Sequence, residues 1–371
     1  MTFDLPHLWS HGVAWLSSHA ISPLLGWLHL TGLAGNPDEI AGALMIAALQ
    51  VAIIALVFRP LESWIPAERW TDRRLTRVDW QYTLLMLLGI FPLFTYLVLT
   101  PFSHLFGGGG AGDSGGSPLA IVEWLPWFGQ HPLLLFLLYY VIYDFVYYWM
   151  HRTQHAIPWW WALHSMHHSQ RQMSCWTNDR GNLIDGFLQS MVLAVVGLLI
   201  GVQPEEFAWL MLIGELMQNF SHTNVRIGFG RVLERAFVDP KFHRLHHMVV
   251  DAERPGLHNC NFGQVFSVWD VVFGTALYGE APRKTGVSDP VVDADNNYNL
   301  LGLHWVSTKR FLGAVRCKAG WKPGEVSFAA ADYRPIPVKQ IDLHAYVKAF
   351  DDAATPSHAV AKESAAICRA P

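Results

Sequence analysis

Two histidine triplets of identical spacing are the residues of this sequence best suited to chemistry. They are His164, His167 and His168, and then His243, His246 and His247. On a helix, positions i, i+3 and i+4 lie on one face, so each triplet can direct two or three imidazoles toward one point. Three buried imidazoles are costly unless they are hydrogen-bonded or bound to a metal. The repeated spacing therefore predicts metal ligation by both triplets.

A histidine pair and a single histidine extend this set. His151 and His155 lie four residues apart, directly after an apolar stretch, and can share a helix face. Such a pair alone is as compatible with a structural role as with ligation. His222 follows another apolar stretch, and we expect it to be a further ligand rather than the cap of a helix end. A structural zinc site needs only four ligands, so these histidines suffice for two metal ions.

Three more residues could bind the metal or orient its ligands. They are His258, Gln218 and Asp144. Gln218 precedes His222 by one helical turn, although it could instead cap its own helix end. Asp144 lies inside an apolar stretch, where a carboxylate is expensive and is usually functional or paired. The alternative role of Asp144 is a buried ion pair with Arg152 or Arg180.

The donor atoms of the site restrict the metal. Imidazole suits iron, zinc, copper and nickel, and the four cysteines are far apart and outside the clusters, which excludes a thiolate zinc site. Zinc has no redox chemistry, whereas a nitrogen-rich iron pair suits the activation of O2 against a C–H bond. We therefore expect two iron ions and O2, although zinc could replace iron in purified protein. Further carboxylates could fix the second ring nitrogen of the ligands: Asp179, Asp185, Asp239 and Asp270.

The composition indicates an integral membrane protein. Of 371 residues, 51% are hydrophobic and only 15% are charged, and the 17 tryptophans suit the interfaces of a bilayer. The net charge of −4 gives no indication of nucleic-acid binding. Four apolar stretches are candidates for membrane-spanning helices. They are residues 40–58, 80–100, 131–150 and 187–220, the last of which is interrupted near 201–206 and predicts a helical hairpin.

The distribution of Lys and Arg predicts the orientation. Residues 1–39 and 101–130 contain neither, whereas 59–79, 152–180 and 226–244 are rich in positive charge, nearly all of it from arginine. Positive loops face the cytoplasm, so we expect the N-terminus outside and all histidine clusters inside. The predicted fold class is an all-α integral membrane protein with about four transmembrane helices, including the hairpin, and a cytosolic helical cap that carries the clusters.

Three segments follow from this organisation. Residues 1–38 form an interfacial N-terminal segment, and 39–280 form the transmembrane and catalytic domain. Residues 281–371 form a cytosolic tail without a catalytic pattern, which could cap the site or dock a redox partner.

The motifs together resemble the membrane-bound fatty acid hydroxylase/sterol desaturase superfamily, the histidine-box di-iron lipid oxygenases. The resemblance covers about residues 139–278, in the order of that family. Its pieces are 144–155, 161–169, 221–224, 240–247, 261–263 and 269–275. The resemblance implies metal ligation by His151, His155, His164, His167, His168, His222, His243, His246 and His247, and all of these except His222 form the expected catalytic set.

The resemblance also implies a reaction: O2-dependent hydroxylation of a membrane lipid, which could be a fatty acyl chain, a glycerolipid, an aminolipid or a sterol. Electrons would come from a reductase, a ferredoxin or a cytochrome. Desaturation at the same centre is the main alternative, and an ether-lipid monooxygenase is another. A membrane metal-binding or transport protein is a further alternative, against which stands the position of the clusters on the cytoplasmic side rather than at mid-bilayer. The oligomeric state stays open.

Two departures from the family pattern concern the substrate. The family's Arg-x-His-Pro is here Arg180-Gly-Asn182-Leu183, and its Asp-x-Asn-Tyr-Gly is Asn259-Cys-Asn261-Phe-Gly. Asn182 is not expected to take over a histidine's role. Alkylglycerol monooxygenases also lack that His-Pro and share the Gln218-x-x-x-His222 pattern, which mildly favours a glycerolipid or another polar lipid over a sterol.

Overall fold

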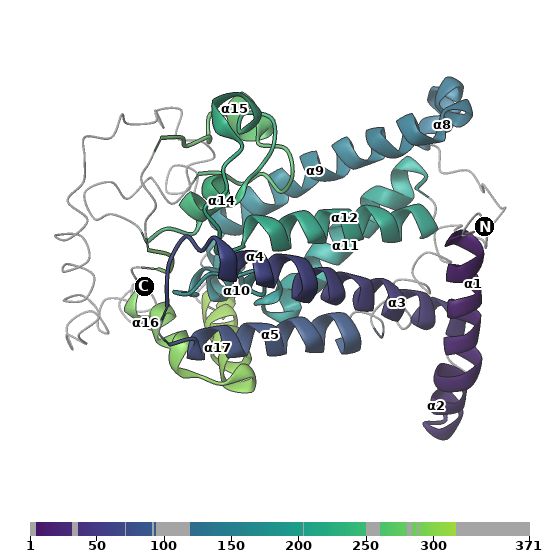
Figure 1. Cartoon of the computed structure of the whole chain (residues 1–371), viewed down its shortest axis with the longest axis horizontal. Coiled ribbons are helices and arrows are strands. Elements are labelled where there is room, and N and C mark those ends of the chain that lie inside the picture. The colour runs from purple at the N-terminus through teal and green to yellow at the C-terminus, as the bar shows by residue number, and fades with distance from the viewer. Residues whose placement is uncertain are drawn as a thin grey trace. The chain divides into compact units, whose positions relative to one another are not determined.

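The protein is helical. The computed structural model describes residues 5–31, 36–70, 72–90, 93, 119–202, 204–249, 260–279, 284–287 and 289–316. Within these residues the regular structure consists of helices and two isolated antiparallel bridges, Pro66 with Val225 and Met248 with Thr285. The predicted all-α fold class is confirmed for this part of the chain (Figure 1).

Three helices of the described chain are long and apolar enough to cross a membrane. They are Pro37–Trp64, Pro132–Ala156 and Leu183–Ile200. The first consists of α3 (Pro37–Ile53), a π-helical turn (Ile54–Phe58) and α4 (Arg59–Trp64), and it contains the predicted span 40–58. The second is α9, which contains nearly all of the predicted span 131–150 and continues beyond it through both histidines of the pair.

The remaining two predicted spans have different outcomes. The stretch 187–220 is divided as predicted, because α11 (Leu183–Ile200) ends just before Gly201 and α12 begins at Pro204. Gly201 has a φ of 82°, which favours glycine and allows the chain to turn there. The second arm, α12 (Pro204–Ser221), carries three glutamates and is not among the three apolar helices. The stretch 80–100 lies partly outside the described residues, which show α5 (Arg74–Leu85) and a π-helical turn (Met86–Ile90).

The chain forms two compact units. The first comprises residues 1–57, 81–143 and 188–216. Its N-terminal helices α1 (Leu5–Leu16) and α2 (Ser22–Trp27) are joined by a π-helical turn (Ser17–Ile21). Apolar side chains of these helices and of the first turns of α3 form one core cluster: Ile21, Leu25, Ile40 and Ala41.

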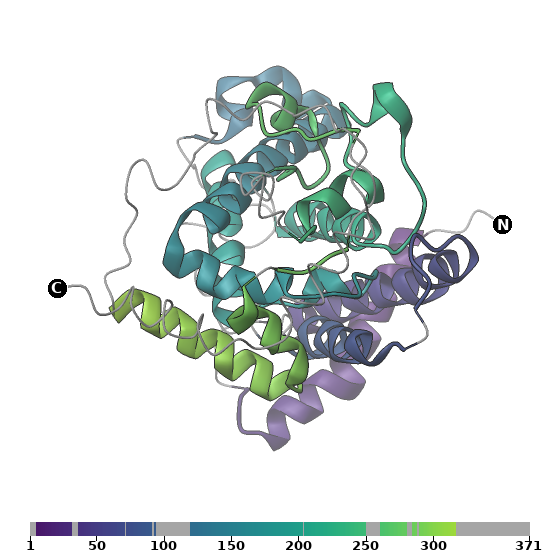
Figure 2. The ribbon, with the colours of Figure 1, turned by 90° about the vertical axis from the view of Figure 1, so that its left-hand side faces the viewer.

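The second unit comprises residues 58–80, 144–187 and 217–371 and contains every histidine cluster. Its helices include α4, the last turns of α9, α10 (Pro158–His168), α13 (Gly230–Leu233), α14 (Pro240–His246), α15 (Val268–Val272), α16 (Pro290–Asp293) and α17 (Leu300–Arg316). A short 3-10 turn, Ala294–Asn297, links α16 to α17 (Figure 2). Part of the predicted tail is therefore folded onto the cluster-bearing unit.

Proline and aspartate define where the histidine helices begin. Pro158 occupies the first turn of α10, where its missing N–H costs nothing, and so separates the first pair from the first triplet. Pro240 does the same in α14, where the Asp239 side chain accepts a hydrogen bond of 2.7 Å from the Phe242 N–H as an N-cap. Each triplet consequently lies at the C-terminal end of a short, well-defined helix.

A buried ionic network fixes the C-terminal end of α10. Arg180 donates to the Met166 carbonyl (3.1 Å) and to Ser169 Oγ (2.9 Å), which are both at that end. It also pairs with the fully buried Asp79 at 3.0 Å. Gln170 and Thr177 donate to the other carboxylate oxygen of Asp79, at 2.7 and 2.9 Å. The end of α10 that carries His167 and His168 is thus held in place by an ion pair without access to water.

Candidate metal centre

The described histidines gather into two groups that could each hold a metal ion. The first group is His151, His155, His164, His168 and His246, and the second is His167, His222 and His247. Within each group the potential ligand atoms all lie within 4.8 Å of one another. The groups adjoin, since the rings of His168 and His247 stack with their centroids 4.3 Å apart. Residues from α9, α10, α14 and the end of α12 therefore meet at one place.

His243, the remaining member of the second triplet, lies beside the second group. Its Nε2 is 3.1 Å from Nε2 of His222. The same His222 atom is 3.1 Å from Nε2 of His167 and 3.1 Å from Nε2 of His247. Two nitrogens bound to one metal at about 2.0–2.1 Å lie roughly 3.0–3.4 Å apart. The spacing of these four atoms suits neighbouring positions around a metal.

The other ring nitrogen of several histidines is fixed by a hydrogen bond. His222 Nδ1 donates to the Gln218 carbonyl (2.7 Å). His151 Nδ1 donates to the Phe262 carbonyl (2.9 Å) and His246 Nδ1 to the Cys260 carbonyl (2.7 Å). This assigns the proton to Nδ1 and turns Nε2 of each ring inward as a lone-pair donor.

Buried nitrogen atoms without partners support metal binding. Among the described residues, Nε2 of His151, His164 and His168 is buried and has no hydrogen-bond partner. Leaving such an atom unsatisfied is expensive, yet three of them point into one group of imidazoles. A metal ion would satisfy all three, so the donor set fits a histidine-ligated centre.

Burial keeps these imidazoles neutral, as ligation requires. Loss of hydration lowers the pKa of His222 to about 4. Loss of hydration is also the main reason that four other histidines have pKa values well below 6.5, and the neighbouring imidazoles lower these values further. They are His167, His168, His243 and His247. At neutral pH their lone pairs are available to a metal.

Asp185, one of the predicted carboxylates, contacts a histidine directly. Its Oδ2 accepts a hydrogen bond of 3.1 Å from His164 Nδ1. Its Oδ1 accepts from the side chains of Gln154 and Trp160, both at 2.8 Å. Because Asp185 is itself held by two donors, it can fix the orientation of the His164 ring. Asp239, in contrast, acts as the N-cap of α14.

Asp270 acts one step further away, on the loop that supports His151. Its carboxylate accepts from the N–H groups of Phe262 and Gly263, both at 2.8 Å. A Cβ at position 263 would lie 2.7 Å from the Phe266 carbonyl oxygen, so only glycine fits there. The Asn-Phe-Gly motif at 261–263 thus shapes a loop in which the Phe262 carbonyl oxygen accepts the Nδ1–H of His151.

Asp144 holds the same loop rather than a histidine. Its carboxylate accepts from the N–H groups of Val265 (2.9 Å) and Phe266 (3.1 Å) and from Trp269 Nε1 (2.9 Å). Neither of the arginines considered as partners contacts it. Gln218 is oriented by Tyr147, whose hydroxyl donates to Gln218 Oε1 at 2.7 Å. His258 lies outside the described residues.

The backbone acceptors could not be identified from the sequence. Every residue has a carbonyl group, so nothing in a sequence distinguishes those of Cys260 and Phe262. Tyr147 was also missed, although its position one helical turn before His151 offered a signal. These groups complete the environment of the imidazoles.

Residues 136–275, in the middle of the chain, match the sequence model of the fatty acid hydroxylase family. The matched segment contains the eight histidines of the two groups and also His243, which lies beside them. The predicted superfamily is confirmed.

Curated relatives include several lipid-modifying enzymes. An ornithine lipid hydroxylase of Rhizobium tropici is 29% identical over 40% of this chain and 43% of its own length. An alkylglycerol monooxygenase of Xenopus tropicalis is 29% identical over 40% of this chain and 32% of its own. A Delta(7)-sterol 5(6)-desaturase of Gibberella zeae is 29% identical over 38% and 40%, respectively. The chain thus spans less than half the length of these relatives. No solved structure matches it.

Proposed function

We propose that this protein hydroxylates the hydrocarbon part of a membrane lipid with O2, at a di-iron centre held by histidines. The observation that carries the proposal is the meeting of two adjoining groups of buried histidines in a fatty acid hydroxylase domain. Two groups suit two metal ions, and the absence of thiolate donors within them suits iron. His243 would complete the nine expected ligands.

The protein's own residues prepare the centre. Iron bound there would supply the activation of O2 for insertion into a C–H bond. The histidines serve as neutral nitrogen donors rather than as acids or bases, because burial lowers their pKa values. Asp185 and the carbonyls of the 260–263 loop hold the rings in place, so that little rearrangement accompanies binding. Burial of the rings also keeps bulk water from the reacting atoms.

We propose a lipid with a polar head as the substrate. The alkylglycerol monooxygenases and the ornithine lipid hydroxylase are named for such lipids. The resemblance to the former includes the lack of the family's His-Pro, at whose place this chain has Asn182-Leu183. Electrons would come from a separate reductase, ferredoxin or cytochrome.

Desaturation is the second candidate, because one relative is named a sterol desaturase. The same centre would then remove two hydrogens instead of inserting oxygen. The position of the substrate carbon relative to the metals decides between the two outcomes.

We further propose that the protein is embedded in a membrane with its N-terminus outside and the histidine groups on the cytoplasmic side. The three apolar helices support the embedding. The arginine-rich segments 59–79 and 226–244 support the orientation. Labelling of single cysteines in intact cells with a membrane-impermeant reagent tests it, since residues near 226–244 should react only after the cells are opened.

Comparative lipidomics of cells that express the wild type, His167→Ala or His11→Ala tests the function. His11 is exposed and outside both groups, so its variant is the matched control. A lipid class that gains one oxygen with the wild type and His11→Ala only would support hydroxylation and identify the substrate. A class that loses two hydrogens would establish the desaturase instead. Purified protein that binds neither iron nor another transition metal would refute the proposal.

A further inference from the structure

Helix α17 carries an exposed apolar face. The exposed fractions are 76% for Leu301, 61% for Trp305, 41% for Leu312 and 50% for Val315. Their spacings of four, seven and three residues put them along one side of the helix. A row of four large apolar side chains at the surface of a unit requires something to cover it.

The same side of α17 is basic. Lys309 and Arg316 are exposed among the apolar side chains, and the Lys309 ammonium lies 5.8 Å from the centre of the Trp305 ring. No Asp or Glu occurs anywhere in Leu300–Arg316. The combination of tryptophan, leucine and lysine on one face is typical of a helix that lies in a membrane interface.

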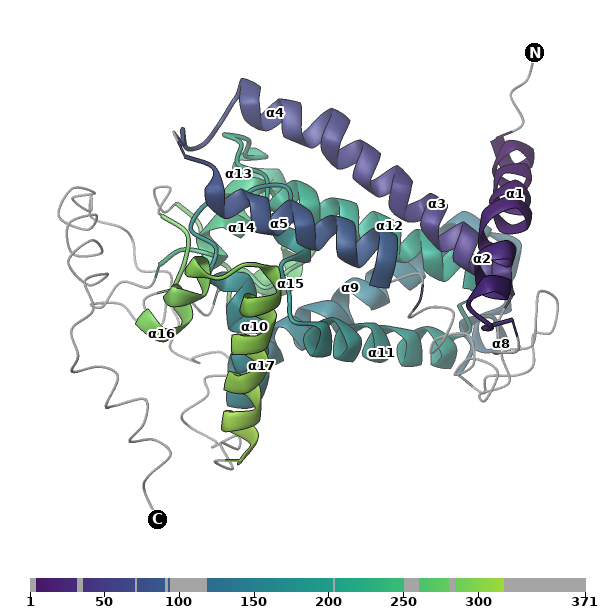
Figure 3. The same cartoon turned by 90° about the horizontal axis from the view of Figure 1, so that it is seen from below.

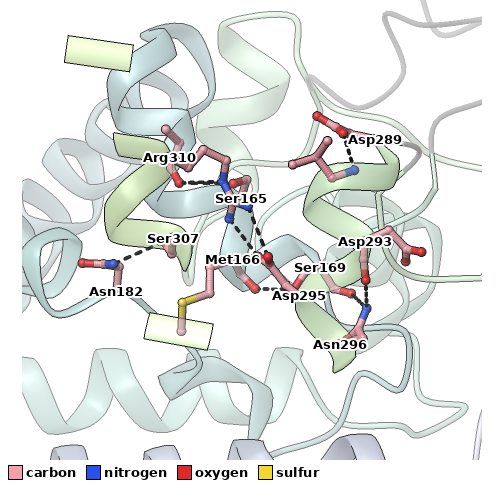
Figure 4. Close-up of polar contacts among 12 residues, drawn as sticks. Ser165, Met166, Ser169, Asn182, Asp289, Asp293, Asp295, Asn296, Ser307 and Arg310 are labelled. Carbon is pink, nitrogen blue, oxygen red and sulfur yellow. Dashed lines mark hydrogen bonds and ion pairs between the residues drawn. The ribbon is translucent and has the colours of Figure 1, made fainter. Parts of the chain in front are cut away.

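The opposite side of α17 packs against the rest of its unit. α17 lies along α10 (Figure 3), and Leu303 and Ser307 are completely buried. Asn182 Nδ2 donates to Ser307 Oγ (3.2 Å) and to Thr308 Oγ1 (3.0 Å), as Figure 4 shows for Ser307. Asn182, which stands where the family pattern has a histidine, therefore holds α17 in place.

A partly buried ion pair adds to this attachment. Arg310 pairs with Asp295 at 2.7 Å and donates to the Ala162 carbonyl of α10 at 3.3 Å (Figure 4). Asn296, the next residue after Asp295, donates to the Ser169 carbonyl at 2.7 Å. With these contacts in place, α17 cannot rotate to hide its apolar side against its own unit.

We propose that α17 is a membrane-surface helix: its outer face, formed by Leu301, Trp305, Lys309, Leu312, Val315 and Arg316, lies among the headgroups of an anionic leaflet. Its inner face meanwhile holds α10, which carries the first triplet. Two exposed cations on a helix that carries no Asp or Glu of its own complement anionic lipid. An acidic redox protein would match the cations but not the row of apolar side chains, so the observations favour lipid. The proposal does not depend on the reaction that the metal centre performs.

Fluorescence quenching in nanodiscs tests the proposal on the full chain. A bimane label is placed at Leu301→Cys or Leu312→Cys, with Cys317 and Cys368 changed to Ser; Cys175 and Cys260 are buried and stay unlabelled. The matched control is Asn297→Cys, which is exposed but polar and precedes the helix. Nitroxide attached to the lipid headgroup reports lipid contact, and aqueous iodide reports water.

The proposal expects headgroup nitroxide to quench positions 301 and 312 several-fold more than position 297, with iodide showing the reverse order. Lys309→Glu/Arg316→Glu should abolish the stronger nitroxide quenching of discs that contain phosphatidylglycerol over discs of phosphatidylcholine alone. Equal quenching of all three positions by iodide, with no effect of nitroxide lipid, would overturn the proposal. Protection from iodide that persists in detergent, together with crosslinks between two copies or to another protein, would overturn it in favour of a protein partner.

Discussion

The hydroxyl of Tyr147 donates a hydrogen bond of 2.7 Å to Oε1 of Gln218, a residue 71 positions later in the chain. Tyr147 lies one helical turn before His151, which belongs to the first histidine group. Gln218 lies one turn before His222, which belongs to the second, and its carbonyl accepts the proton of His222 Nδ1. This single contact therefore connects the supports of the two groups.

Tyr147→Phe should lower turnover while leaving most of the metal in place. The substitution removes one buried hydrogen bond, worth about 1 kcal/mol, and frees the Gln218 amide to turn. Tyr143→Phe is the matched control, because it removes a buried hydroxyl of the same helix whose hydrogen bond, of 2.9 Å, goes to the Leu193 carbonyl rather than to Gln218. Turnover and metal content of both variants check this. Equal turnover in the two variants would argue against a role for Tyr147 beyond stability.

Asp185→Asn should weaken metal binding. The asparagine can no longer stabilise His164 as a negatively charged acceptor, although it still reaches Gln154 and Trp160. Loss of such a partner of a ligating histidine costs about 10–100-fold in metal affinity. Metal retention against a graded chelator measures the loss. Asp72→Asn, which changes an exposed carboxylate, should retain metal like the wild type. The same behaviour for Asp185→Asn would separate Asp185 from the metal centre.

Asp79→Ala should destabilise the protein strongly. It leaves the buried Arg180 guanidinium without its counter-charge, a change that typically costs about 3–5 kcal/mol. The double variant Asp79→Leu/Arg180→Met should recover much of this loss, since both charges disappear together. Thermal unfolding of the purified proteins measures both effects. An Asp79→Ala variant as stable as the wild type would mean that the pair does not hold α10.

Acid should destabilise the metal-free protein. Burial lowers the folded-state pKa of His222 to about 4 and those of His167, His168, His243 and His247 well below 6.5. Between pH 6.5 and the folded-state values, the unfolded chain binds protons that the folded chain does not. Stability is therefore fully present above about pH 6.5 and falls as the pH decreases, by up to about 1.4 kcal/mol per pH unit for each such histidine.

Thermal unfolding of chelator-treated protein between pH 8 and pH 5 measures this slope. Protein carrying metal should be more stable at each pH and should release metal as protons compete for the ligands. His222→Gln should reduce the slope of the metal-free form. A melting temperature that does not change with pH would contradict the buried, neutral state of the imidazoles.

The histidines of the site could be predicted from the sequence better than the residues that hold them in place. Histidines at i, i+3 and i+4 must share a helix face, so spacing alone brought His164 together with His168, and the apolar stretches predicted the helices that carry them. Which carboxylate reaches a ligand depended on the path of the chain after α10, and that path selected Asp185 over Asp239. The contribution of Asp144 followed from tertiary contacts with a loop more than 120 residues later, which no local pattern records.

The fold of residues 284–316, in the predicted tail, could not be predicted from the sequence either. Leu300–Arg316 has no catalytic motif, and its attachment depends on pairs such as Asn182 with Ser307 that lie 125 residues apart. A departure from the family pattern at Asn182 was visible at once, but its partner was not. The second half of the predicted span 80–100 and His258 lie outside the described residues, so those two predictions stay open.

The hydrogen bond between His151 and the Phe262 carbonyl spans 111 residues, and it sets the order of biogenesis. A chain emerging from the ribosome exposes the first pair and the first triplet long before the loop that fixes His151 exists. Until residue 262 is synthesised, the proton of that imidazole is not confined to Nδ1, and the partial set of histidines offers a site of undefined geometry. We therefore expect metal to bind at the final stage of maturation, once the 260–263 loop has been synthesised and its carbonyl groups hold the rings of His151 and His246.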